Sequence, residues 1–262
     1  MSDYEAGQIL GQWPVDIGGL RLDRVDEHSV EWSLTELRGW GSAAASGEST
    51  DRPGARGSWA PSRWERRAKD YTLTLAVDAE TPAARWAAEQ RLLGAIDGVD
   101  QLMVVHEEIP RQTTVRLNGA IDIVRTSVYT FDAEVPLLAL DPLRYGLEPH
   151  EVTFARGGTV AIPNVGNTTA WPRIRLNGPL TNPKVQLSAD VFMKIDATIP
   201  AGSWLLIDTD RRYVRMFDDP AGNLRGSWSG TWFGIKSGGA PVSLIADAGA
   251  GTATVTVPAT WN

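Results

Sequence analysis

The sequence predicts a mainly β protein with two strand-rich halves and a single α-helix. Runs of alternating apolar and polar residues, separated by Gly, Pro, Asn and Asp, recur through most of the 262 residues. Helix-capping signals flank only one segment. Charge also divides the chain, because residues 1–150 hold 24 acidic and 15 basic side chains, whereas residues 151–262 hold 8 and 10. These observations predict two domains with a boundary near residue 150.

The first half contains the clearest strand and the one predicted helix. In residues 70–78, DYTLTLAVD, apolar side chains alternate with polar ones, which predicts a strand with one buried face. The helix is expected at about residues 82–97, because Thr81 is a favourable N-cap, a proline follows it, and Gly98 comes after the end. Three apolar side chains fall on one side of this helix, which is expected to lie against a sheet through Trp86, Leu93 and Ile96.

Ahead of that strand, residues 38–67 lack a periodic pattern and are rich in Gly, Ser, Ala, Pro and Arg. A structureless loop of this length is unusual in a compact domain and is usually functional or mobile. Arginine and tryptophan are enriched at protein interfaces. The loop is therefore a candidate protein interface, with the candidate residues Arg56, Trp59, Arg63, Trp64 and Arg66. A flexible, solvated loop is the alternative interpretation.

The second half shows only strand-like segments separated by turns. Residues 164–187, NVGNTTAWPRIRLNGPLTNPKVQL, illustrate the pattern, because Asn, Gly and Pro form three turn clusters around one short alternating run. A helix is excluded there, since the prolines would break its hydrogen-bond ladder. This pattern predicts a β-sandwich or barrel over residues 151–262.

Composition and charge narrow the classes of function. A formal net charge of −7 argues against a general nucleic-acid-binding surface, which needs concentrated Lys and Arg. The chain has no cysteine, so it has no disulfide or thiolate chemistry, and this suits a reducing cytoplasm. The acidic start shows no secretion signal, and no run of about 18 apolar residues predicts a membrane span. We therefore expect no membrane insertion.

A search for catalytic, cofactor-binding and metal-binding residues yields none. His106 precedes two glutamates, but adjacent strand residues point to opposite faces, so no metal site is expected there. The acidic run 208–210 lacks the glycine of a calcium loop and predicts a hairpin turn. Residues 226–230, GSWSG, have tryptophan where a nucleophile elbow has serine. The sequence therefore predicts no enzyme activity and no cofactor.

Three tryptophans of the second half suggest a binding site for carbohydrate. Trp204, Trp228 and Trp232 can form a sugar-stacking platform, because aromatic rings pack on the apolar faces of sugars. Packing in a core is the commoner use of such rings. Trp228 and Trp232 are the candidate carbohydrate-binding residues.

The order of several motifs resembles a known family. The stretch DPLRYG closes the first half at 141–146, and NVGNTTAWPRIRLNGPLTNPKV at 164–185, GSWLLIDTDRRYV at 202–214 and ATW at 259–261 follow it. In this order, which covers nearly the whole chain, the motifs resemble the distal tail proteins of long-tailed (siphovirus) bacteriophages. The long segment 38–67 has no counterpart that can be matched residue by residue.

The resemblance implies both a fold and a function. The fold is an N-terminal ring-forming β-sandwich or split barrel with one helix, followed by a C-terminal galectin-like β-sandwich. Members of this family form a hexameric ring at the distal end of the tail tube. The chain is then a structural virion protein of the tail tip, assembled in the bacterial host cytoplasm. Its expected partners are further copies of itself, the tail tube protein, the tape-measure protein and a baseplate hub protein.

DNA is expected to pass through the channel of this ring only in transit. An acidic first half suits such a channel, because a wall that repels phosphate does not retain the duplex. Two other functions stay open. A carbohydrate-binding module for host-wall recognition would bind glycans through residues 151–262 and lose this binding in Trp228→Ala. A hydrolase would reveal itself in an activity screen against peptidoglycan.

Overall fold

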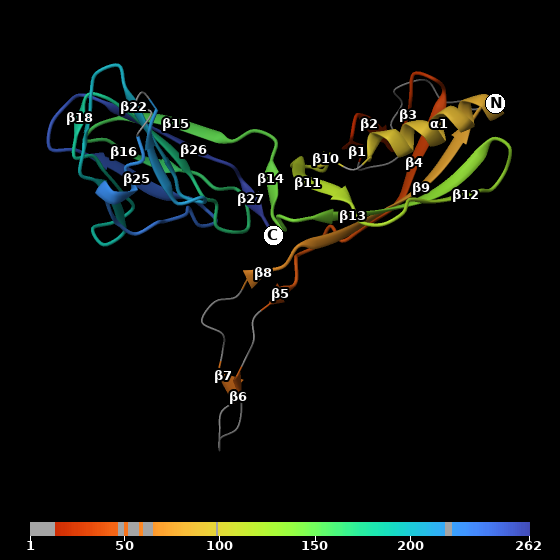
Figure 1. Cartoon of the computed structure of the whole chain (residues 1–262), viewed down its shortest axis with the longest axis horizontal. Helices are drawn as coiled ribbons and strands as arrows, with labels where there is room; N and C mark the ends of the chain where they lie inside the picture. Colours follow the sequence, from red (N-terminus) through yellow and green to blue (C-terminus); the bar gives the residue numbers. More distant parts are fainter. Residues whose placement is uncertain (1–13, 47–49, 52–57, 60–64, 98, 218–221) are drawn as a thin grey trace. The chain divides into compact units, whose positions relative to one another are not determined.

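The chain folds into two compact units, each of which is described by itself. The computed structural model describes residues 14–46, 50–51, 58–59, 65–97, 99–217 and 222–262. Unit 1 comprises Met1–Leu147 with Asn262, and unit 2 comprises Glu148–Trp261. Both units consist mainly of strands, and the described residues include one α-helix (Figure 1). The predicted mainly β fold with a single helix is confirmed.

Unit 1 is built on one antiparallel sheet. Its strands are β1 (Val15–Ile17), β2 (Leu20–Leu22), β3 (Arg24–Val25), β4 (Val30–Arg38), β9 (Lys69–Ala79), β10 (Gln101–Val105), β11 (Arg111–Leu117), β12 (Asp122–Arg125), β13 (Thr130–Ala139) and β14 (Arg144–Gly146). They pair in the order β2-β1-β10-β11-β13-β9-β4-β3, while β12 pairs with β13 and β14 with β11.

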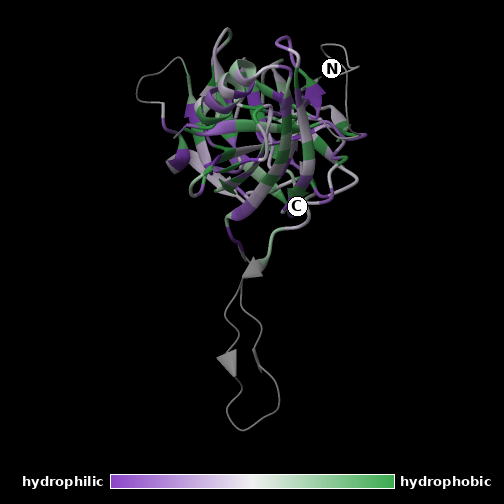
Figure 2. Ribbon diagram, turned by 90° about the vertical axis from the view of Figure 1, so that its right-hand side faces the viewer, coloured by the Kyte–Doolittle hydropathy of each residue, from purple (hydrophilic) through white to green (hydrophobic). Residues whose placement is uncertain are grey.

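The central strands of this sheet show why the sequence alternates. All ten residues of β13 pair with β9, and in both strands the odd-numbered side chains are buried while the even-numbered ones are not. Successive side chains of a strand point to opposite faces, so one face of this pair enters the core. Figure 2 shows the resulting alternation of hydrophobic and hydrophilic residues along the strands. The strand predicted at 70–78 is confirmed.

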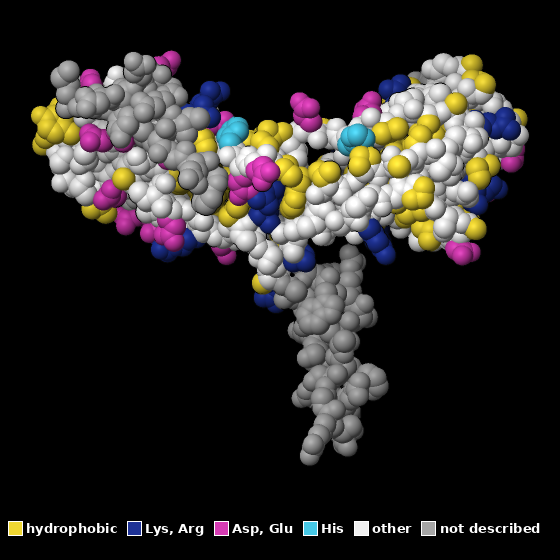
Figure 3. Space-filling view, turned by 180° about the vertical axis from the view of Figure 1, so that it is seen from behind, with side chains coloured by type: hydrophobic (Ala, Val, Ile, Leu, Met, Phe, Trp, Pro, Cys, Tyr) yellow, Lys and Arg dark blue, Asp and Glu magenta, His cyan; other side chains and the backbone are white. Residues whose placement is uncertain are grey.

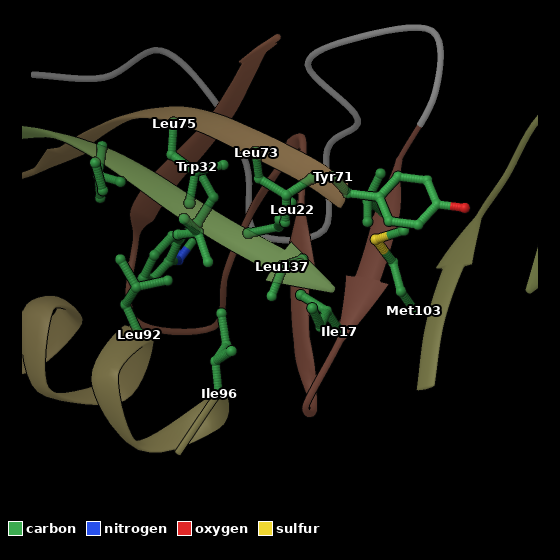
Figure 4. Packing of buried hydrophobic residues seen from close by; sticks show 14 of the residues in the cluster. Ile17, Leu22, Trp32, Tyr71, Leu73, Leu75, Leu92, Ile96, Met103 and Leu137 are labelled. Atoms are coloured by element: carbon green, nitrogen blue, oxygen red, sulfur yellow. The ribbon is translucent and has the colours of Figure 1, made fainter. Parts of the chain in front are cut away.

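The helix α1 (Pro82–Ala95) covers the buried face of the sheet and contacts β2, β4 and β9. Its first turn begins as predicted, because the Thr81 side chain accepts a hydrogen bond from the Ala84 amide at 3.1 Å. In Figure 4, Leu92 and Ile96 point from α1 toward the sheet residues, among them Trp32. The Trp32 ring meets Phe131 edge-on, with 6.4 Å between ring centroids.

The buried face of α1 is not the predicted one. Trp86 and Leu93 are 59% and 41% exposed, so their predicted contact with the sheet is wrong, whereas Ile96 is buried. Three other residues face the sheet instead: Ala88, Glu89 and Leu92. Ala88 permits a close approach, and Glu89 is buried because arginines pair with it. Apolar spacing alone did not indicate this face.

The segment 38–67 contains regular structure that its composition did not predict. Two short antiparallel pairs form within it, β5 (Ala45–Ser46) with β8 (Glu65–Arg66) and β6 (Thr50–Asp51) with β7 (Ser58–Trp59). These pairs are antiparallel within one segment, which we call the long hairpin; its described parts are thus paired where its composition predicted a structureless loop. These strands are defined by backbone pairing between the two arms of the hairpin. Each is only two residues long, which is too short to show the alternation of side chains that predicts a strand from sequence.

Unit 2 is a β-sandwich, as predicted. Its strands are β15 (His150–Ala155), β16 (Thr159–Ile162), β17 (Arg173–Asn177), β18 (Leu180–Thr181), β19 (Lys184–Gln186), β20 (Phe192–Ile195), β21 (Thr198–Ile199), β22 (Trp204–Asp208), β23 (Tyr213–Met216), β24 (Trp228–Gly230), β25 (Ala240–Ile245), β26 (Thr252–Val257) and β27 (Thr260–Trp261). Two five-stranded sheets have the orders β15-β26-β17-β22-β23 and β16-β25-β19-β20-β24. The predicted turn after Asp208 is confirmed, because Asp208 pairs with Tyr213 across a hairpin.

Candidate functional site: an acidic sheet face and the root of a long hairpin

The face of the unit 1 sheet that points away from α1 is acidic. Four neighbouring strands contribute to it, in the order β12, β13, β9 and β4. The positions that alternate with the buried residues of these strands include seven carboxylates, those of Glu31, Glu36, Asp70, Asp78, Asp122, Asp132 and Glu134. Acidic side chains on the surface of unit 1 are magenta in Figure 3.

Two pairs of these carboxylates face each other directly. Glu31 in β4 lies opposite Asp78 in β9, and Asp122 in β12 lies opposite Glu134 in β13. Like charges in such positions destabilise a sheet. Burial, together with the negative charge of Asp78, raises the pKa of Glu31. The sheet therefore retains this face at a cost in stability, which indicates a function for it.

Arg38 is the one basic residue on this face of the four strands. Its Nε donates a hydrogen bond to the Glu36 carboxylate at 2.7 Å. This bond and the nearby charges of Glu36 and Glu134 raise the pKa of Arg38, and the same bond lowers the pKa of Glu36. Because Arg38 neutralises a single carboxylate, the face keeps a negative charge at neutral pH.

The root of the long hairpin is a cluster of basic and aromatic side chains around Trp40. The guanidinium carbons of Arg111 and Arg144 lie 5.6 and 5.0 Å from the centroid of the Trp40 ring. The Trp40 ring packs against Tyr71 at 5.8 Å, and Lys69 Nζ lies 5.2 Å from the Tyr71 ring. Cation–π contacts of this kind contribute about 0.5–2 kcal/mol each. The cluster holds the chain at both ends of the hairpin, since Trp40 comes before its first strand β5 and Lys69 comes after its last strand β8.

Backbone contacts fix the hairpin at the same place. Lys69 Nζ donates to the carbonyl of Gly41, and Arg66 donates to the carbonyl of Ala43 at 3.0 Å. Gly39, where the chain leaves β4, has φ of +86°, and a Cβ there would lie 2.2 Å from a backbone oxygen of β9. Only glycine fits that position. The direction in which the hairpin leaves the sheet is thus set by its root.

Lys69 makes the stability of unit 1 depend on pH. Burial lowers the pKa of Lys69 to about 8, and the charges of Arg144, Arg111 and Arg66 contribute to this decrease. The unfolded chain binds the proton up to about pH 10.5, so stability rises as pH increases from 8 toward 10.5. We expect the free energy of unfolding, measured relative to Lys69→Met, to increase by at most about 3 kcal/mol over this range. Chemical denaturation checks this, and a constant difference contradicts it.

The five predicted interface residues belong to the segment 38–67. Arg56, Arg63 and Trp64 lie outside the described residues, and of Trp59 only the backbone, in β7, is described. Arg66 lies in β8, at the root of the hairpin, where its side chain contacts the backbone. The interface prediction for these five residues stays a prediction.

The two candidate carbohydrate residues stack on each other. The rings of Trp228 and Trp232 lie 4.6 Å apart at an interplanar angle of 11°, and both pack against the core of unit 2. Trp204 stacks on Phe217 at 4.2 Å and also carries the Arg175 guanidinium at 4.3 Å from its ring centroid. These contacts occupy ring faces that a sugar would need. Carbohydrate binding by Trp228 and Trp232 stays a prediction.

Within the described ranges, no group of three or more His, Asp or Glu side chains is arranged to hold a metal ion. His106 Nε2 lies 3.0 Å from an Asp16 carboxylate oxygen, which is an ordinary polar pair. The helix α1 is too short and too polar to cross a membrane.

The mainly β architecture of two units, with one helix in the first, is shared with a solved phage protein. The chain is similar in structure to the Dit protein (gp 19.1) of SPP1, described as a paradigm of the hub adsorption apparatus in phages that infect Gram-positive bacteria. The TM-score is 0.69 over 94% of this chain and 98% of that one, at 15% sequence identity. The resemblance indicated by the order of motifs is thus confirmed as a shared fold. No family model and no curated protein sequence matches the chain.

Proposed function

We propose that this chain is a structural protein of a phage tail, a distal tail protein of a siphovirus that forms a ring, a homohexamer, at the tail tip. The observation that supports this most directly is the fold, which is shared with a hub adsorption protein over nearly the full length of both chains. A ring of identical subunits uses heterologous contacts, in which one patch of each subunit meets a different patch of the next. The function therefore lies in binding surfaces, and we propose no enzyme activity.

The acidic sheet face is the proposed lining of the channel through this ring. Duplex DNA carries a negative charge about every 1.7 Å along its axis, so a wall of carboxylates repels it. The opposed pairs Glu31–Asp78 and Asp122–Glu134 weaken the sheet, and repulsion of DNA in transit supplies a reason to keep them.

The long hairpin is the proposed contact with a neighbouring subunit or another tail protein. Tryptophan and arginine frequently dominate the binding energy of interfaces, so Trp59 and Trp64 are the proposed anchors. The arginines Arg56, Arg63 and Arg66 then meet acidic residues of the partner. The buried root around Trp40 supports this role, because it fixes the base from which the hairpin extends.

The proposed partners follow from the position at the tail tip. The ring joins the tail tube protein and the tape-measure protein on one side to a baseplate hub protein on the other, in the virion after assembly in the host cytoplasm. Unit 2 is the proposed galectin-like sandwich and provides a further binding surface.

Mass measurement tests the ring. Native mass spectrometry or light scattering of the purified chain is expected to show a species of six times 28.4 kDa, and electron microscopy a ring at the distal end of the tail. A chain that stays monomeric at all concentrations and is absent from the tail tip in particles contradicts the proposal.

Charge reversal tests the channel lining. Rings of the variant Asp132→Lys, Glu134→Lys are expected to bind duplex DNA, and salt should weaken this binding steeply, because each lysine that contacts a phosphate releases a counterion. The wild type is expected not to bind. Glu151→Lys, Asp190→Lys in unit 2 is the matched control, since it changes the net charge equally on exposed positions elsewhere. Equal DNA binding by both variants would show that net charge alone acts.

A further inference from the structure

Unit 1 contains a pocket of about 610 Å³ that the proposed ring does not explain. It is lined by residues of α1 and of the segment around β2 and β3, which Figure 1 shows beside the helix. Its wall includes three arginines, a tryptophan and an aspartate: Arg21, Arg24, Arg91, Trp32 and Asp26.

The carboxylate of Asp26 has four partners within the chain. It accepts hydrogen bonds from the backbone amides of His28 at 2.8 Å and Val30 at 3.0 Å, and from the Trp32 indole at 2.9 Å. It also lies 2.7 Å from the Arg91 guanidinium. Burial raises the pKa of Asp26, but these hydrogen bonds and the Arg91 charge outweigh it, so the pKa is lowered. Asp26 therefore stays ionised and orients Arg91 at the pocket wall.

Two arginine donors in this wall have no partner in the part of the chain that the structure describes. The Nε–H groups of Arg24 and Arg91 are buried, and neither meets a hydrogen-bond acceptor among the described residues. Leaving such a donor unsatisfied costs about 1–3 kcal/mol. In native structures a group of this kind usually has a water or an ion as its partner. Both arginines line the same pocket, so their guanidinium groups place positive charge on one wall.

The charge of the wall favours a negative group. Arg21 adds a third guanidinium, and it is exposed at the pocket. The remaining carboxylate, that of Glu27, is 87% exposed and lies 3.7 Å from His28. Guanidinium groups present a planar fork of donors that matches the two oxygens of a carboxylate or phosphate. Because unit 1 carries many acidic side chains elsewhere, we expect an anion to bind at this basic pocket in preference to the rest of its surface.

We propose that this pocket binds an oxyanion group, a carboxylate or a phosphate, through Arg21 and Arg24 beside Arg91. Within a ring, the group is the carboxylate of an acidic side chain from a neighbouring copy of the chain. That source rests on the proposed function, because heterologous contacts bring two different patches of neighbouring copies together and charges across an interface are complementary. Binding of the group itself does not depend on ring formation.

Titration with inorganic phosphate tests the site. Calorimetry on the full chain, at constant ionic strength set by sodium chloride, is expected to show saturable binding to one site. Arg24→Gln and Arg21→Gln are each expected to weaken it at least about tenfold, the loss of one charged hydrogen-bond pair. Arg116→Gln is the matched control, because Arg116 lies on β11 in the same unit and pairs with Asp100 on the surface. Circular dichroism verifies that each variant is folded.

Two results overturn the site. If the wild type shows no saturable binding, the pocket holds water only. If Arg21→Gln and Arg24→Gln both bind phosphate as the wild type does, the anion lies elsewhere. If Arg24→Gln does not fold, Arg21→Gln still tests the site, because an exposed arginine can be replaced without disturbing the fold.

The same variants identify the source of the oxyanion. If a neighbouring copy supplies it, phosphate and Arg24→Gln both shift the mass distribution of the oligomer toward the monomer, and Arg116→Gln does not. If the oligomer is unchanged while phosphate binding is lost, the natural ligand is a free phosphate compound. If the chain forms no oligomer at all, the proposed function fails, and the phosphate titration still decides whether the site exists.

Discussion

Replacing residues 47–64 by Asn-Gly is expected to abolish self-association and incorporation into tails while both units stay folded. In the hairpin, Ser46 lies opposite Glu65, so a two-residue Asn-Gly turn closes the shortened hairpin in register. The root cluster around Trp40 is retained. The change removes the two proposed anchors, Trp59 and Trp64. Native mass spectrometry of the purified chain and electron microscopy of particles measure the result.

A substitution at constant length separates the anchors from the hairpin itself. Trp59→Ala, Trp64→Ala is expected to weaken association by at least about tenfold, since an anchor residue typically contributes 2 kcal/mol or more. Trp86→Ala is the matched control, because this tryptophan on α1 is 59% exposed and lies outside the hairpin. If the shortened chain forms the same oligomer as the wild type, the hairpin is not the interface.

Glu89→Ala is expected to destabilise unit 1 by about 3 kcal/mol or more, because it leaves a buried charge without its partner. The Glu89 side chain is 3% exposed and accepts two hydrogen bonds from Arg125 at 3.0 Å and one from Arg85. Arg125 is 64% exposed, so water can hydrate it after the change, whereas Arg85 is 14% exposed and loses its carboxylate partner, keeping a hydrogen bond to the carbonyl of Val128. Denaturant unfolding measures the loss.

The pH dependence of this loss has a definite sign. The hydrogen bond from Arg125 and the charges of both arginines lower the pKa of Glu89, against the opposing effect of burial. Its stabilisation is therefore present above about pH 4.5 and disappears as pH falls through the lower pKa of the folded state. The difference between wild type and Glu89→Ala is expected to shrink in acid.

Two further variants complete this test. Glu80→Ala, an exposed position just ahead of α1, is expected to change the free energy of unfolding by less than about 0.5 kcal/mol. The double variant Arg85→Met, Glu89→Leu is expected to be more stable than Glu89→Ala, since it removes both charges. If the single and double variants lose the same stability, the ion pair does not explain the effect. Because Arg125 belongs to β12, Glu89 also links the helix to this strand of the sheet.

Local patterns made the strands and the start of the helix predictable. Alternation over residues 70–78 predicts β9 because its period matches that of a strand, and Thr81 marks the first turn of α1 because its side chain caps the helix. The face of α1 was not predictable in this way. Glu89 faces the core because Arg125, distant in sequence, completes its hydrogen bonds there.

The acidic face was likewise predictable from the sequence only in part. Asp78, Asp132 and Glu134 occupy polar positions of alternating strands, and this signal could have identified them as solvent-facing carboxylates. Nothing in one strand indicates its neighbours. The sheet order β12-β13-β9-β4 alone places these residues on one continuous face.

The sequence by itself determined the mainly β class, the start of the single helix and the acidic character of the first half, because composition and short-range periodicity carry that information. The tertiary structure decided which carboxylates face each other, which side of α1 is buried and which arginines meet in one pocket. These features depend on pairings between residues far apart in the chain, and strand register and side-chain packing select them.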